Sequence, residues 1–180
     1  MAEFKSAPPI DTARLALRAH TVDDFADCAA LWGNPDVVRY IGGVPSTPEA
    51  TWARLLRYAG HWTLLGYGYW AIRDRATHAF LGEAGFADHH RDVTPALEPP
   101  ECGWVLAPAA HGRGLATEAV RAILEWADAR GWRRTTAMID PGNTSSLRVA
   151  EKCGFERFAS ATYLGDSTIL FARELQHARG

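Results

Sequence analysis

Residues 104–119 join a short apolar run, a proline stop and a glycine loop that opens directly into an amphipathic helical pattern. The first N–H groups of a helix have no partners within the helix, and the helix dipole adds partial positive charge there. Gly112 and Gly114 let the backbone bend tightly and let a ligand approach without a Cβ in the way. This junction therefore predicts a binding site for an anion such as phosphate.

The residue spacing excludes two other kinds of site. A dinucleotide-binding fingerprint needs a third glycine and a framing βαβ unit, and residues 112–114 have neither. Cys28, Cys102 and Cys153 are far apart and lack Cys-x-x-Cys spacing, while His89-His90 has no third ligand at a convincing spacing. We therefore expect neither a bound metal nor a disulfide framework.

Length and composition indicate a globular protein. The 180 residues are 47% hydrophobic and 22% charged, with a net charge of -2. We expect a single domain over residues 1–180 with a loose arm at residues 1–9, because Pro8-Pro9 disfavours a helix there. The balanced charge argues against a nucleic-acid partner, and no apolar run is long enough to span a membrane. The isolated cysteines fit a reducing cytoplasm, which is the expected location.

Strand and helix patterns alternate along the chain in an order typical of a mixed α/β sheet with helices on both faces. Strands are predicted at residues 14–18, 67–73, 79–87, 101–107, 134–139, 155–162 and 168–175. Helices are predicted from Thr21 to residue 33, at residues 36–41, after Thr47, at residues 115–130 and after Asn143. The helix after Thr47 is expected to bury Trp52, Leu55, Leu56, Ala59 and Trp62.

Three motifs resemble those of the GNAT superfamily, the acetyl-CoA-dependent N-acetyltransferases. Residues 101–106 and 111–119 are similar to the family's fourth strand and its Gln/Arg-x-x-Gly-x-Gly/Ala loop. Residues 143–147 and 151–155 resemble two further motifs. The chain is most similar to the branch containing the ribosomal-protein N-terminal acetyltransferases. The resemblance covers nearly the whole chain and implies a mixed, mostly antiparallel sheet in which the family's fourth and fifth strands splay apart.

The resemblance also implies acetyl-CoA as co-substrate. In the family, loop amides hold the coenzyme A pyrophosphate, and the pantetheine arm lies between the splayed strands. His111 departs from the usual glutamine or arginine, but main-chain contacts do not depend on its side chain. The residues implied in cofactor binding are Trp104, Val105, Leu106, His111, Gly112, Arg113, Gly114, Leu115, Ala116, Thr117, Asn143 and Ser146.

Two residues are implied in the chemistry, each with a plainer alternative. Glu101 is the expected general base, directly or through water, or else an exposed glutamate at a strand end. Glu83 on the neighbouring strand is the weaker alternative for the base. Many family members protonate the thiolate with a tyrosine at the position that is Ala150 here. Ser146 lies four residues earlier on the same helical face and is the expected substitute, or else it only completes the helix start. Asn143 has the same two interpretations, as a pantetheine ligand and as a helix N-cap.

The acceptor site of the family is formed by the N-terminal helices and nearby strands, which implies Tyr40, Trp52, Trp70 and Glu83 as acceptor-binding residues. The implied reaction is direct transfer of an acetyl group to a primary amine, on a protein N-terminus or a small molecule, in a ternary complex. A catalytically inactive acyl-CoA-binding module and a transferase of another short acyl group such as succinyl are the alternatives. Monomer and homodimer both remain open.

Overall fold

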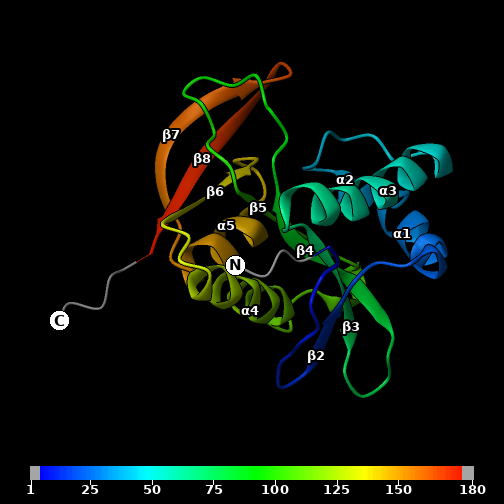
Figure 1. Ribbon diagram of the computed structural model, residues 1–180. Helices are drawn as coiled ribbons and strands as arrows, with labels where there is room; N and C mark the ends of the chain where they lie inside the picture. Colours follow the sequence, from blue (N-terminus) through cyan, green and yellow to red (C-terminus); the bar gives the residue numbers. More distant parts are fainter. Residues whose placement is uncertain (1–4, 176–180) are drawn as a thin grey trace.

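A computed structural model of the chain describes residues 5–175 and has one eight-stranded sheet with the strand order β1-β2-β3-β4-β5-β6-β8-β7 (Figure 1). All neighbouring pairs are antiparallel except β5 and β6. The strands are β1 (Ile10–Asp11), β2 (Leu15–Arg18), β3 (Tyr69–Asp74), β4 (Phe80–Ala87), β5 (Glu101–Leu106), β6 (Arg134–Ile139), β7 (Glu156–Tyr163) and β8 (Asp166–Glu174). The helices are α1 (Phe25–Trp32), α2 (Pro35–Val38), α3 (Pro48–Leu65), α4 (Leu115–Ala129) and α5 (Thr144–Lys152).

Local sequence signals set the helix ends. Thr47 Oγ1 accepts a hydrogen bond from the Ala50 N–H at 3.1 Å, Pro48 occupies the first helical position of α3, and Gly66 ends that helix with φ of 71°. Asn143 Oδ1 accepts from the Ser146 N–H at 3.0 Å and begins α5. The predicted elements are therefore present, and the sequence pattern missed only the two-residue strand β1 and two short 3-10 turns.

Helices cover both faces of the sheet, as residues of β4 on opposite faces illustrate. Glu83 contacts Trp32 of α1 and Tyr58 of α3, whereas Phe86 packs against Trp126 of α4 with ring centroids 6.3 Å apart. Most buried apolar side chains belong to one core between the sheet and α4, and a smaller cluster lies under α1 and α2. The predicted fold class, a mixed and mostly antiparallel sheet with helices on both faces, is confirmed.

The splay predicted between the family's fourth and fifth strands lies between β5 and β6 here. These two strands share one aligned pair, Glu101 with Thr136. Beyond it β5 remains paired with β4 over the whole of Glu101–Leu106, and β6 remains paired with β8. The two strands therefore separate toward the ends that lead into α4 and α5.

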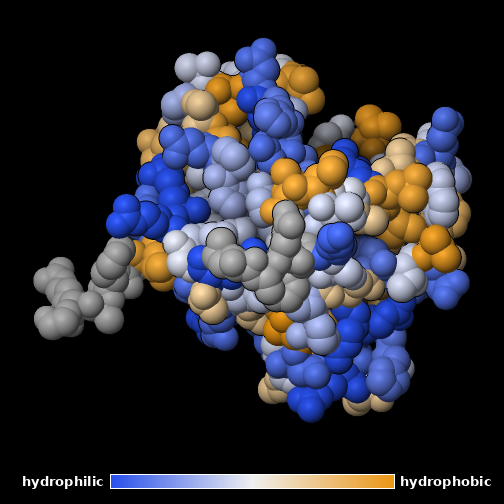
Figure 2. All heavy atoms as spheres, in the orientation of Figure 1, coloured by the Kyte–Doolittle hydropathy of each residue, from blue (hydrophilic) through white to orange (hydrophobic). Residues whose placement is uncertain are grey.

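Three predictions about the packing of α3 are wrong. Trp52 and Leu56 are 39% and 52% exposed, Ala59 is also exposed, and Figure 2 shows apolar residues gathered on the surface over α3. The buried side of α3 carries Thr51, Leu55, Tyr58, His61 and Trp62, because several of its inward side chains are polar and contact the polar groups described below.

The expected loose arm also differs from the structure in part. Residues 1–4 lie outside the described residues. Ala7, however, is buried, and the Pro8 carbonyl accepts a hydrogen bond from Trp70 Nε1 at 2.7 Å. Residues 7–8 are thus held against the core. No helix among residues 5–175 is long and apolar enough to cross a membrane.

Candidate active site

A cavity of about 550 Å³ lies where β5 and β6 separate. Trp104 and Val105 border it on the β5 side, Met138 and Asp140 on the β6 side. Helix α3, the loop between β4 and β5, and the hairpin of β7 and β8 also contribute, together with residues of α1, the segment after α2, β3 and the start of α5. The β6-facing edge of β5 has no strand partner beyond Glu101 within the described residues. Unpaired strand groups at an open edge are suited to an extended ligand that carries amides.

Glu101 borders this cavity and forms a bidentate ion pair with Arg91. Arg91 Nε donates to Glu101 Oε2 at 2.7 Å, and Arg91 Nη2 donates to Oε1 at 2.9 Å. Burial lowers the pKa of Arg91, but the hydrogen bonds and charge of Glu101 outweigh this and raise it, so the guanidinium stays charged. A carboxylate offers about four lone-pair sites, of which Arg91 uses two. Glu101 therefore keeps acceptor capacity while its position is fixed.

Asn143 and Ser146 lie on the opposite side of the same cavity, at the start of α5. The Asn143 side chain uses its oxygen as the N-cap of α5, and no hydrogen bond of its Nδ2 occurs within the described residues. Asn143 is thus a helix cap whose amide donors remain available to a ligand. Ala150, at the position of the family's tyrosine, is buried and does not border the cavity.

The glycine loop lies beyond the C-terminal end of β5 and outside the cavity wall. Gly112 and Gly114 have φ values of 72° and 75°, a region that glycine adopts without strain. Residues 111–114 are exposed, and Gly114 is the N-cap of α4. His111 Nε2 lies 2.8 Å from the carbonyl oxygen of Leu106, so the ring is turned back toward β5. The predicted anion site therefore has the geometry of an open helix N-terminus.

Contacts from the N-terminal hairpin fix this helix start. Arg14 Nη1 donates to the Arg113 carbonyl at 2.9 Å, and Arg14 Nη2 lies 2.6 Å from Glu118 Oε2. Thr12 Oγ1 donates to Glu118 Oε1 at 2.6 Å. Burial raises the pKa of Glu118, but these bonds outweigh it and the net pKa is lowered. The sequence pattern did not reveal this contact, because its partners are about a hundred residues apart.

Of the four predicted acceptor-binding residues, Tyr40 borders the cavity and the other three do not. Trp70 is fully buried against Trp62 and Trp126, because strand β3 is covered on both faces. Trp52 packs on Phe25 at the outer side of α3, and Glu83 is fully buried behind the cavity wall. Trp52, Trp70 and Glu83 therefore lie outside the lining of this cavity.

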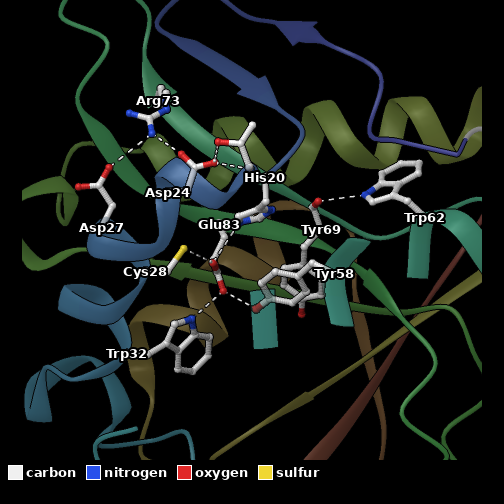
Figure 3. A network of polar contacts seen from close by, with 11 residues as sticks. His20, Asp24, Asp27, Cys28, Trp32, Tyr58, Trp62, Tyr69, Arg73 and Glu83 are labelled. Atoms are coloured by element: carbon white, nitrogen blue, oxygen red, sulfur yellow. Dashed lines mark hydrogen bonds and ion pairs between the residues drawn. The ribbon is translucent and has the colours of Figure 1, made fainter. Parts of the chain in front are cut away.

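Glu83 instead connects two cavity-lining side chains from behind (Figure 3). It accepts hydrogen bonds from Trp32 Nε1 at 2.8 Å and from the Tyr58 hydroxyl, and it lies 3.2 Å from His20 Nε2. Burial first, and then the charge of Glu83, raise the pKa of Tyr58 well above its usual value. The Tyr58 hydroxyl therefore stays protonated and fixed to Glu83.

His20, Cys28 and Glu83 together offer metal-ligating atoms within 4.8 Å of one another. Burial first, and then the charge of Glu83, raise the pKa of the Cys28 thiol, which disfavours the thiolate that binds metals. Both oxygens of Glu83 already accept hydrogen bonds. The carboxylate of Glu83 is thus already engaged by protein donors, whereas His20 Nδ1 is buried without a hydrogen-bond partner. The absence of a metal stays a prediction.

Sequence reasoning missed most of the wall opposite β6. Besides Glu101 and Tyr40, this wall contains residues from α1, α3, β3 and the loop between β4 and β5, and Tyr163 comes from the end of β7. The missed residues are Trp32, Arg54, Arg57, Tyr58, Tyr69, His89, Arg91 and Tyr163. One sequence signal could have indicated part of this wall. The polar residues of α3 at i, i+3, i+4 and i+7 share one side of the helix, although that side is not apolar and so does not resemble a core-facing stripe; they are Arg54, Arg57, Tyr58 and His61.

His89 gives a prediction about pH. Burial, followed by the charges of Arg91 and Arg57, lowers the pKa of His89 to about 3. The unfolded chain binds this proton below pH ~6.5 and the folded chain does not, so stability falls as the pH drops from ~6.5 toward 3. We expect His89→Gln to reduce the loss of unfolding free energy between pH 7 and pH 5 by about 2 kcal/mol, measured by urea denaturation. His90→Gln is the matched control, because the His90 side chain is 90% exposed. Identical pH profiles for wild type and His89→Gln would contradict the prediction.

Comparisons with known proteins agree with this geometry. Residues 14–156 match the acetyltransferase (GNAT) domain family. YkkB of Bacillus subtilis (strain 168) is 33% identical over 150 residues, which are 79% of this chain and 82% of that protein. A structure from Bordetella pertussis assigned to the GnaT family of acetyltransferases superposes with a TM-score of 0.82 at 31% identity, covering 93% of this chain and 99% of the other.

A more distant structure shares the fold. The ribosomal L7/L12 alpha-N-protein acetyltransferase RimL, solved in complex with coenzyme A, has a TM-score of 0.75 at 19% identity, covering 93% of this chain and 98% of that one. The domain match extends from β2 to the start of β7 and includes both splayed strands and the glycine loop between them. The chain therefore belongs to the GNAT family of acetyltransferases and is an acyltransferase.

Proposed function

We propose that this chain transfers an acetyl group from acetyl-CoA to a primary amine by direct attack in a ternary complex. The observation that carries the proposal is the cavity between β5 and β6, which has Glu101 on one side and Asn143 with Ser146 on the other. RimL, whose fold is similar to that of this chain, was solved in complex with coenzyme A. The cytoplasm is the proposed location, since all three cysteines are free and buried.

The residues fit the parts of coenzyme A. The open N-terminus of α4 with residues 111–117 suits the pyrophosphate, because free backbone N–H groups and the helix dipole both favour an anion. The unpaired edge of Trp104, Val105 and Leu106 suits the pantetheine amides. The side-chain amide of Asn143 supplies a further donor. Acetyl-CoA, when bound, supplies a thioester carbon that an amine can attack.

The reaction then requires two proton transfers, one from the amine and one to the sulfur, and the cavity offers a group for each. The neutral amine forms the C–N bond, and Glu101 accepts a proton from the amine nitrogen through water, using the lone pairs that Arg91 leaves free. As the C–S bond breaks, Ser146 Oγ passes a proton to the thiolate sulfur and takes one back from water, while protonated Glu101 returns its proton to water. Tyr163 also borders the cavity and is the alternative donor, a group that motif spacing did not reveal.

Thiol release provides the test of this function. Purified protein is incubated with acetyl-CoA and a panel of amines, and free coenzyme A is measured; succinyl-CoA in place of acetyl-CoA tests the alternative acyl group. We expect release that depends on the amine. Tight binding of acetyl-CoA by calorimetry without any amine-dependent release would favour the acyl-CoA-binding module instead. Absence of binding would overturn both.

Asn143→Asp separates the two roles of this residue. Aspartate keeps the side-chain oxygen that caps α5 but removes the amide donors and adds a negative charge. We expect unchanged thermal stability within about 0.5 kcal/mol and a roughly tenfold weaker Kd for coenzyme A, since one hydrogen bond contributes about 1 kcal/mol and the new charge adds to its loss. Asn143→Ser, which also keeps a capping oxygen, is the control for the added charge. Unchanged affinity in both variants would limit Asn143 to capping.

A further inference from the structure

Two arginines of α3, the half-buried Arg54 and the exposed Arg57, line the cavity without a carboxylate partner within the described residues. Arg54 and Arg57 both border it, three residues apart on one side of the helix. Neither forms a salt bridge with another residue among those described, and Arg54 Nε is buried with no hydrogen-bond partner. Cations that border a cavity unpaired are available to a ligand anion.

Arg54 is also held in a defined orientation. Its guanidinium lies over the Trp32 ring, with the central carbon 3.5 Å from the ring centroid. The Trp32 indole N–H is in turn bonded to the buried Glu83 at 2.8 Å, so the ring itself is fixed. Stacking uses the face of a guanidinium and leaves its N–H donors at the edge free. Arg54 is therefore a pre-positioned donor rather than a mobile surface charge.

The other charged groups of the cavity do not pair directly with these two arginines. Arg91 and Glu101 neutralise each other. His89 is uncharged near neutral pH, because burial and the neighbouring arginines lower its pKa to about 3. Asp140 and Asp166 belong to the opposite side, at the end of β6 and the start of β8. A polycationic amine would meet two arginines at the α3 wall, whereas an anionic group would be stabilised there.

These arginines are also displaced from the proposed seat of the coenzyme A phosphates. Residues 111–117 at the start of α4 do not border the cavity, and α3 packs on the sheet face opposite α4. An anion bound by α3 therefore belongs to the second substrate.

We propose that the acceptor amine carries a carboxylate, and that Arg54 and Arg57 bind this carboxylate so that the amine points toward Glu101. The inference rests on the proposed function and names its substrate class: an amino acid, or a peptide whose first residue is acidic. The arginine fork matches a carboxylate through paired N–H donors, which gives selectivity against amines that lack one.

The first experiment compares matched acceptors by thiol release from acetyl-CoA. Each free amino acid is paired with its amide, and peptides beginning with Asp or Glu are paired with peptides beginning with Asn or Gln. We expect kcat/KM to be about 10- to 100-fold higher for the carboxylate member of the preferred pair, the range of one or two charge-assisted hydrogen bonds. The pair that shows the preference identifies whether the bound carboxylate belongs to a free amino acid or to the acidic first residue of a peptide. Equal use of both members, or a preference for spermidine, would overturn the inference while leaving acyl transfer intact.

Variants assign the preference to the two arginines. Arg54→Gln and Arg57→Gln are expected to raise the KM for the carboxylate acceptor about tenfold each, with no change in the KM for acetyl-CoA. Arg133→Gln is the matched control, since Arg133 is exposed and does not border the cavity. An effect on the KM for acetyl-CoA alone would assign these arginines to the coenzyme and overturn the inference.

A binding measurement is independent of turnover. N-acetyl amino acids or N-acetylated acidic peptides, and the corresponding amides, are titrated calorimetrically into the protein saturated with coenzyme A. We expect the carboxylates to bind at least about tenfold more tightly, and the difference to disappear in the Arg54→Gln/Arg57→Gln double variant. Equal affinities would refute the carboxylate site even if no amine is ever acetylated, whereas carboxylate binding without thiol release would refute only the proposed transfer.

Discussion

Replacing Glu101 by glutamine is expected to lower kcat by about 100-fold or more, with the KM for acetyl-CoA changed less than about threefold, because a positioned general base contributes about 10²–10⁴ in rate. Glutamine keeps the shape of the side chain but cannot accept a proton from the amine. Steady-state thiol release with the preferred acceptor measures both constants. Glu98→Gln is the matched control, since Glu98 lies just before β5 in the chain and its side chain is 73% exposed.

Glu101→Gln also removes the ionic partner of Arg91, so a purely structural effect must be separated from a catalytic one. The pH profile of kcat/KM does this. If Glu101 is the proton acceptor, the acidic limb that it contributes disappears in the variant. A variant that retains this limb at a lower plateau would make Glu101 a positioning residue, and a rate within about threefold of wild type would exclude either role.

Gly114→Pro is expected to weaken coenzyme A binding by about 100-fold or more. Gly114 has φ of 75° at the N-cap of α4, whereas proline fixes φ near −65°. The substitution therefore rotates the loop and also removes one backbone N–H from the proposed phosphate seat. Calorimetric titration with coenzyme A measures the affinity, and far-UV circular dichroism with a thermal melt measures the fold.

Gly131→Pro is the matched control for this change. Gly131 follows the other end of α4 with φ of 74°, so proline creates the same backbone conflict and a similar loss of stability away from the anion seat. We expect Gly131→Pro to bind coenzyme A like the wild type when both are folded. Equal losses of affinity in the two variants would mean that α4 as a whole, rather than its N-terminus, was damaged. Wild-type affinity in Gly114→Pro would place the phosphates elsewhere.

Among the predicted site residues, those of the acceptor site agree least with the cavity lining. The family resemblance implies Tyr40, Trp52, Trp70 and Glu83, which belong to the N-terminal helical region and nearby strands, but of these four only Tyr40 borders the cavity. Trp70 lies on a strand that is covered on both faces, so its side chain enters the core. Glu83 acts one layer further back, through Tyr58 and Trp32. No local pattern distinguishes a residue in the wall from one directly behind it.

Most secondary-structure elements and the glycine loop follow from local sequence patterns. The caps at Thr47 and Asn143 and the glycines at 112 and 114 act on residues close to them in the chain, so the sequence predicts their effects. The pairing of charges, in contrast, depends on tertiary contacts. Arg91 neutralises Glu101 across a loop, and Arg14 holds the start of α4 from the N-terminal hairpin. Arg54 and Arg57 are candidate ligand-binding residues because neither forms a salt bridge within the described part of the chain. Such pairings follow from the strand order and the divergence of β5 from β6, which depend on contacts far apart in sequence.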